Sequence, residues 1–133
     1  MEIDVRAYLD RLGIREPGAP SVTALSALHR AHVERVTYEA LDIQLGRLAP
    51  IDPGRAVARI LGGRGGYCYH LNGAFSALLT ALGYHVTRHR AGVQTRGAPP
   101  PGVAWANHLA LTVELEGHIW LADVGLGDAL HEP

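Results

Sequence analysis

Apolar residues recur at helical spacing through residues 1–83 of the chain. Four segments show this pattern, and they begin or end at residues that typically cap helices. The first follows Asp4 and stops at Gly13, the second begins at Ser21, the third follows Asp52, and the fourth stops at Gly83. The apolar stripe of the fourth consists of Leu71, Phe75, Leu78, Leu79 and Leu82. The pattern therefore predicts four helices.

After residue 83 the apolar residues alternate with polar ones, which is typical of strands. His85–Arg90 reads as one strand, and Leu109–Leu115 alternates strictly. Pro99–Gly102 reads as a loop between them, and Glu116–Gly117 as a two-residue hairpin turn. The chain is thus expected to have an α+β fold, with an N-terminal helical bundle followed by antiparallel strands.

The two-residue turn fixes which residues face each other across the hairpin. Val113 then lies opposite Trp120, and Ala110 opposite Asp123. His108 falls on the face away from the apolar set, as a diagonal neighbour of Asp123. Their Cα atoms would be about 7–8 Å apart, which an imidazole and a carboxylate can bridge. A turn of odd length would instead put them on opposite faces.

Composition and charge exclude several classes of function. The chain has 133 residues, 47% hydrophobic and 19% charged, which predicts one globular unit. Acidic and basic residues nearly balance, with a net charge of -1, so no long-range field favours a nucleic acid or a membrane as partner. Every basic residue other than histidine is Arg, so a P-loop lysine and a Schiff-base lysine are excluded.

The cysteine content and the N-terminus indicate a cytoplasmic protein. Cys68 is the only cysteine and cannot form an internal disulfide. The first residues are acidic where a signal peptide would be basic, and no apolar run approaches the roughly 20 residues that span a bilayer.

Cys68 is the candidate nucleophile, because it follows a glycine-rich run and begins a predicted helix. The positive end of the helix dipole and free N–H groups are expected to lower its pKa. The glycines let backbone amides approach a reacting carbonyl as an oxyanion hole would. His108 as base and Asp123 as its orienting carboxylate would complete a Cys-His-Asp arrangement of the cysteine-protease type.

Other interpretations of the same residues stay open. A lone cysteine is often a small core residue, and Asp123 before a glycine can be a turn aspartate. The run Gly62–Gly66 could hold a phosphate, although it lacks the usual spacing, and histidines could bind zinc. The remaining histidines have no partner that the sequence reveals and are interpreted as structural: His29, His32, His85, His89, His118 and His131.

Four segments resemble motifs of the arylamine N-acetyltransferases, in the family's order and with similar gaps. They are Arg64–Asn72, His32–Asp42, Asn107–Leu109 and Asp123–Gly127. The resemblance implies an acetyltransferase that uses acetyl-CoA as donor, an arylamine or hydrazine as acceptor, a ping-pong cycle and no metal.

The resemblance also implies roles for single residues. Cys68, His108 and Asp123 would form the triad, with an acetyl group carried on the cysteine. Glu39 and Arg64 would pair and brace the loop that contains Gly66 and Tyr67, and Tyr38 and Leu126 would line the acceptor pocket. The sequence departs from the family's usual residues at His70, Ala40 and Leu126.

The family's architecture implies a division of this chain. Residues 1–83 would form the helical domain with Cys68, and residues 84–133 a partial β domain, the start of a β-barrel, with His108 and Asp123. The family's third, α/β domain would be absent from this truncated chain. The exposed sheet is then expected to be covered by self-association or by a complementary C-terminal fragment.

Two alternatives to this function are considered. An amide synthase of the same fold would use the same triad on a polyketide thioester. A catalytically silent truncated homologue would use the fold as a binding or regulatory module.

Overall fold

The computed structural model describes residues 1–47, 49–93, 107–127 and 130–133. Within these ranges five helices precede three strands. The helices are α1 (Val5–Leu12), α2 (Val22–Arg35), α3 (Leu41–Gln44), α4 (Pro53–Leu61) and α5 (Cys68–Ala81), and the strands are β1 (His85–Ala91), β2 (His108–Leu115) and β3 (His118–Ala122). This order confirms the α+β fold class, whereas the predicted loop Pro99–Gly102 lies outside the described residues.

Side chains cap the helices where the sequence predicted helix starts. The side chains of Asp4, Ser21 and Asp52 each accept a hydrogen bond from the backbone N–H three residues later. Gly13 ends α1 in the left-handed conformation, with φ of 71°. The sequence pattern does not predict α3, because this single turn buries none of its residues and so shows no apolar stripe.

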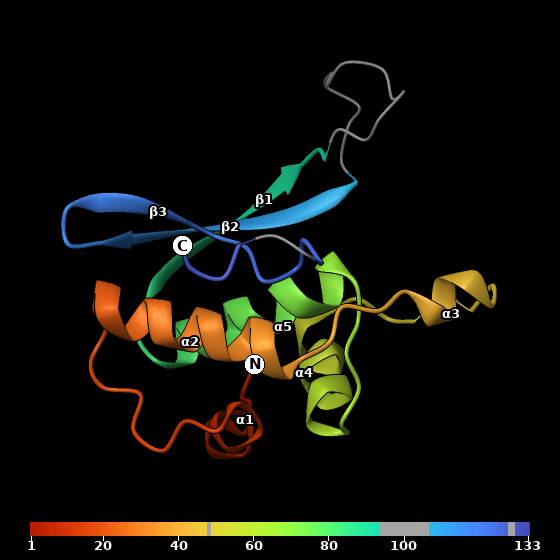
Figure 1. Ribbon diagram of the computed structural model, residues 1–133, viewed down its shortest axis with the longest axis horizontal. Coiled ribbons are helices and arrows are strands. Elements are labelled where there is room, and N and C mark those ends of the chain that lie inside the picture. The colour runs from red at the N-terminus through yellow and green to blue at the C-terminus, as the bar shows by residue number, and fades with distance from the viewer. Residues whose placement is uncertain (48, 94–106, 128–129) are drawn as a thin grey trace.

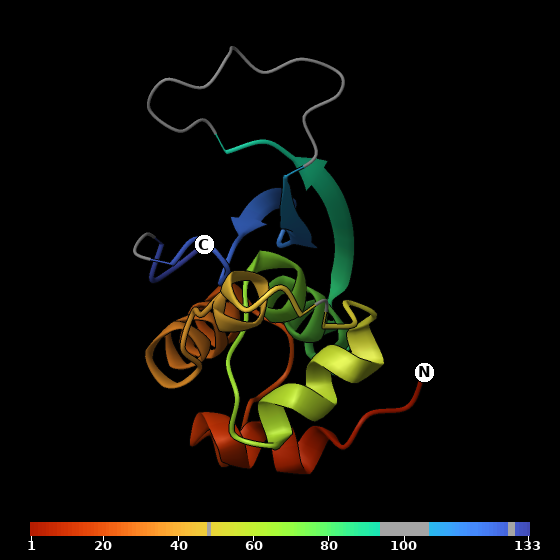
Figure 2. The same cartoon turned by 90° about the vertical axis from the view of Figure 1, so that its right-hand side faces the viewer.

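The central element of the fold is α5. Its apolar stripe confirms the prediction, since Leu71, Phe75 and Leu78 are fully buried. Figure 2 shows α5 between the sheet above and α1 and α4 below, while α2 lies alongside. The N-terminus of α5 therefore lies where helices and sheet meet.

The three strands form one antiparallel sheet in the order β1-β2-β3 (Figure 1). Val113 pairs with Trp120 and Leu111 with Ala122, which confirms the predicted register. Glu116 and Gly117 have φ of 54° and 76°, the left-handed values that a two-residue hairpin turn requires. The turn therefore has two residues, which is the length that the prediction of His108 as a neighbour of Asp123 requires.

Among the described residues, one face of the sheet is buried and the other is exposed around β3. Leu111, Val113 and Ala122 are fully buried on the face that packs against α5. On the other face Ile119 and Leu121 are 72% and 51% exposed. No helix in the described ranges is both long and apolar enough to cross a membrane.

Candidate active site

Cys68 is the first residue of α5, as the sequence predicted, and it is 5% exposed. The glycine-rich segment before Cys68 runs close beside the backbone of Thr37–Glu39. The Glu39 N–H donates to the Gly66 carbonyl at 2.8 Å, and a Cβ on Gly65 would lie 1.7 Å from the Thr37 carbonyl oxygen. Only glycine fits at position 65, so the glycine-rich run serves this close approach of two backbone segments.

The electrostatic environment of Cys68 differs from the expectation. Burial raises the pKa of the Cys68 thiol, although backbone N–H groups of Leu109 and Tyr69 act to lower it. The charge of Asp123 raises it further. The thiol instead donates to the Asn107 carbonyl, with Sγ and oxygen 3.8 Å apart. The expected lowering by the helix N-terminus is therefore wrong, because desolvation outweighs it.

His108 and Asp123 form a direct pair beside the first turn of α5. The distance from His108 Nε2 to Asp123 Oδ2 is 2.5 Å. Both side chains are buried, with 6% and 4% of their surface exposed. Because Nε2 faces the carboxylate, Nδ1 is the ring nitrogen left for another partner. The Cys68 thiol donates to the carbonyl of Asn107, the residue directly before His108, so Cys68 lies close to the His108–Asp123 pair.

Asn72 holds Asp123 from α5. Its side-chain N–H groups donate to Asp123 Oδ1 at 2.8 Å and to the Leu109 carbonyl at 2.6 Å. Its side-chain oxygen accepts from the Val124 N–H at 2.9 Å. Asn72 has no predicted role, although its spacing is a signal: Cys68 and Asn72 are four residues apart and share a face of a mostly apolar helix.

Gly125 brings the segment after β3 onto the same turn of α5. Its N–H donates to Asp123 Oδ1 at 2.9 Å. A Cβ at this position would lie 2.8 Å from the Cα of Cys68 and 2.9 Å from Nδ2 of Asn72. The absence of a side chain thus lets Asp123 and Cys68 approach each other.

A cluster of ion pairs supports the glycine-rich segment before Cys68. Arg64 pairs with Glu39 at 3.1 Å, as the resemblance implied, but Arg59 makes the larger set of contacts. Arg59 donates to the Asp42 carboxylate at 2.8 Å, to the Gly65 carbonyl at 2.5 Å and to the Glu39 carboxylate. The hydrogen bond from Arg59 lowers the pKa of Asp42. Arg59 has no predicted role, because it lies on α4 outside every motif.

His70, in the first turn of α5, supports the same segment. Its Nε2 donates to the Pro50 carbonyl at 3.0 Å, and its ring lies 4.7 Å from that of Tyr67. A Cβ on Gly66 would come within 2.5 Å of the Cβ of His70. Burial lowers the pKa of His70, followed by the charge of Arg59. The unusual residue at this position is therefore a neutral support beneath the loop.

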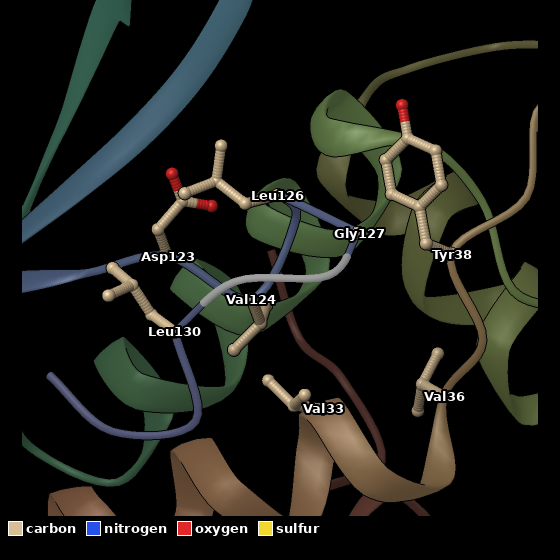
Figure 3. Close-up of a pocket in the computed structure, with 8 residues that line it drawn as sticks. All are labelled: Val33, Val36, Tyr38, Asp123, Val124, Leu126, Gly127 and Leu130. Carbon is tan, nitrogen blue, oxygen red and sulfur yellow. The ribbon is translucent and has the colours of Figure 1, made fainter. Parts of the chain in front are cut away.

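Tyr38 and Leu126 border one pocket, as the resemblance implied (Figure 3). Five of the eight residues that line it are aliphatic, and Asp123 borders it too. The residues are Val33, Val36, Tyr38, Asp123, Val124, Leu126, Gly127 and Leu130. The pocket thus lies between the end of α2 and the segment after β3 that begins with Asp123.

Two histidines that the sequence left without partners are fully buried on α2. His32 Nε2 lies 2.8 Å from the Tyr8 hydroxyl, and burial lowers the pKa of His32 to about 3. His29 Nε2 accepts from the Asp123 N–H at 3.1 Å. In the described part of the chain, no group of three or more His, Cys, Asp or Glu residues is arranged to hold a metal ion.

The family model described as "N-acetyltransferase" matches residues 21–133. The arylamine N-acetyltransferase / N-hydroxyarylamine O-acetyltransferase of Salmonella typhimurium is 36% identical over 124 residues, which are 92% of this chain and 43% of that protein. The proansamycin X synthase of Amycolatopsis mediterranei is 36% identical over 126 residues, which are 92% of this chain and 48% of that protein.

A solved structure of the Salmonella typhimurium arylamine N-acetyltransferase matches the whole fold. Its TM-score is 0.88 at 35% identity, and the match covers 100% of this chain and 48% of that chain. The chain thus spans about half the length of the relatives that it matches.

Proposed function

The chain belongs to the arylamine N-acetyltransferase family, and on that basis we propose that it transfers an acetyl group from acetyl-CoA through Cys68 to an arylamine or hydrazine nitrogen. The observation that carries the proposal is the 2.5 Å contact of His108 Nε2 with Asp123 Oδ2 beside the buried Cys68. In that geometry Asp123 fixes the ring so that Nδ1 is free to accept the thiol proton.

The first half-reaction forms an acetyl thioester on the protein. His108 takes the proton of Cys68 as Sγ attacks the thioester carbonyl carbon of acetyl-CoA. The new C–S bond forms while the bond to the sulfur of CoA breaks, and the proton from His108 leaves with that sulfur as the CoA thiol. A base is required here, because burial raises the pKa of the Cys68 thiol.

The second half-reaction returns the protein to its first state. The acceptor nitrogen attacks the acetyl carbon, and the bond to Sγ of Cys68 breaks. His108 takes the extra proton of the nitrogen and returns a proton to the sulfur, so that the acetylated amine and the free thiol result. We expect the aromatic ring of the acceptor to pack against Tyr38 and Leu126, which border the pocket next to Asp123.

Intact-mass spectrometry after brief incubation with acetyl-CoA tests the proposal, with Cys68→Ala as the control. We expect one added acetyl group on the wild-type chain, none on the variant, and loss of the adduct when an arylamine is added. Two results together would favour a silent homologue. The folded wild-type chain would gain no acetyl group, and its Cys68 would react with iodoacetamide no faster than in His108→Gln.

An amide synthase is the second candidate, and the match to proansamycin X synthase is compatible with it. That reaction would use the same three residues, with a longer acyl group on the cysteine. Offering the chain acetyl-CoA and a long-chain aromatic acyl thioester in competition separates the two, because the adduct mass identifies the preferred donor.

We further propose that the uncovered sheet face around Ile119 and Leu121 packs against a second copy of the chain or a complementary C-terminal segment. Sedimentation of the wild-type chain beside Ile119→Glu tests this. A higher mass for the wild type alone would support self-association, whereas monomers in both samples would leave only the complementary segment.

A further inference from the structure

His29 lies fully buried on α2, far in sequence from the candidate triad, and both of its ring nitrogens are engaged by the C-terminal segment. Nδ1 lies 2.7 Å from the carbonyl oxygen of His131. Because a carbonyl can only accept, Nδ1 carries the ring proton. Nε2 is then the unprotonated nitrogen and accepts the backbone N–H of Asp123 at 3.1 Å.

Asp123 depends on this contact because it follows the last residue of β3. The ladder between β2 and β3 ends at the pair Leu111 and Ala122, so no strand hydrogen bond fixes the Asp123 N–H. The carboxylate of Asp123 is held by Asn72 on one side and by His108 on the other. The imidazole of His29 holds the Asp123 N–H itself, while Asn72 accepts the next N–H along the chain, that of Val124.

We infer that His29 is a positioning residue, which holds the Asp123 backbone so that the carboxylate keeps His108 oriented toward Cys68. The inference rests on the proposed function. A positioning role for His29 differs from a packing role, because positioning requires an acceptor atom at the Nε2 position and not merely a ring of the right size. The ring also packs edge-on against Phe75 at 6.0 Å, so packing and positioning have to be tested separately.

The charge state of His29 gives the contact a pH dependence. Burial lowers the pKa of His29, while the His131 carbonyl and the charge of Asp123 act in the opposite direction. The groups that face it are Asp123 and His131 from the C-terminal segment and His32 from its own helix. A proton added to Nε2 would turn the acceptor into a donor opposite another N–H, and the contact with Asp123 would be lost.

Two substitutions separate the two hydrogen bonds. In His29→Gln the side-chain oxygen reaches the position of Nε2 and can still accept from Asp123. In His29→Asn the shorter amide reaches the position of Nδ1 and can donate to His131, but it leaves the Asp123 N–H without an acceptor. Both variants lose the ring that packs on Phe75, so they are matched in their packing defect.

The first measurement is the rate of Cys68 alkylation by iodoacetamide between pH 5 and 9, which needs neither acetyl-CoA nor an amine. At pH 7 we expect His29→Gln to stay within about threefold of the wild type and His29→Asn to fall roughly tenfold or more, as for other small displacements of reacting groups. His32→Gln, a buried change on the same helix without contact to Asp123, controls for lost stability and should leave the rate unchanged. Equal rates in the Gln and Asn variants at equal stability would overturn the inference.

The second measurement is amide hydrogen exchange at Asp123, read by NMR together with the ring signals of His108. Protection of the Asp123 N–H should persist in His29→Gln and disappear in His29→Asn, with a shift of the His108 signals only in the latter. This result would support positioning even if no acetyl adduct forms and the proposed function fails. Full protection in His29→Asn would overturn the inference whatever the activity.

Discussion

Acid should destabilise the fold through His32, which is fully buried on α2. The perturbation is a change from pH 7.5 to pH 5, applied to the wild type and to His32→Gln. The glutamine oxygen can still accept from the Tyr8 hydroxyl, so the variant removes the titrating ring while keeping that hydrogen bond. It also loses the contact with the Phe75 ring, whose centroid lies 5.0 Å away, but this loss is the same at both pH values.

The magnitude follows from the difference in proton binding between the two states. The pKa of His32 is about 3 in the folded chain, against an ordinary value of 6.5. Between these values the unfolded chain binds more protons, so the unfolding free energy falls as the pH falls. At pH 5, which is 1.5 units below the ordinary value, the loss is about 2 kcal/mol at 1.36 kcal/mol per unit. Burial also lowers the pKa of His29 and His70, so the wild type should lose more than this.

The assay is urea unfolding at the two pH values, followed by circular dichroism. We expect the loss of unfolding free energy between pH 7.5 and 5 to be about 2 kcal/mol smaller in His32→Gln than in the wild type. His118→Gln, the same substitution at an exposed histidine of β3, controls for the change in composition. If His32→Gln and the wild type lose the same free energy within about 0.5 kcal/mol, the reasoning is refuted.

Three further substitutions test other parts of the structure. Gly125→Ala should lower the unfolding free energy by about 1–3 kcal/mol and slow the alkylation of Cys68, because the new Cβ meets the α5 backbone. The control Gly54→Ala, whose new Cβ meets only the side chains of Met1 and Asp52, should neither lower the unfolding free energy nor slow the alkylation. Arg59→Lys should lower the thermal midpoint and speed proteolysis of the loop before α5, since an ammonium cannot make the three contacts of the guanidinium. An unchanged midpoint in a thermal melt would contradict this. Ser21→Ala should cost about 1 kcal/mol in urea unfolding through loss of the α2 cap, and a cost near zero would show that the cap is not effective.

The sequence predicted the fold well where the information was local. Helix starts at Asp4, Ser21 and Asp52 depend on contacts within a few residues, and the hairpin register depends on the two-residue turn Glu116–Gly117. The short helix α3 could not be predicted, because it buries no side chain and so has no hydrophobic period.

The supporting contacts of the candidate site are long-range, and the sequence did not reveal them. His29 meets Asp123 across 94 positions, Asn72 across 51, and Arg59 reaches Glu39 across 20. None of these partners follows from spacing within an element, because tertiary packing alone brings them together. Cys68, in contrast, was found because glycines and a helix start mark it locally.

The raised pKa of Cys68 shows why the supporting contacts matter for reactivity. A charge near a helix N-terminus gains about 0.3–1 kcal/mol, which is less than the 1.36 kcal/mol of one pKa unit. Desolvation of a buried group can shift a pKa by several units, so position at the helix start cannot by itself make Cys68 a thiolate. The proposed function therefore requires proton transfer from Cys68 to His108, and with it the orientation that Asp123 gives the ring. Because α2, α5 and the segment after β3 all hold Asp123, a substitution distant from the thiol can control its chemistry.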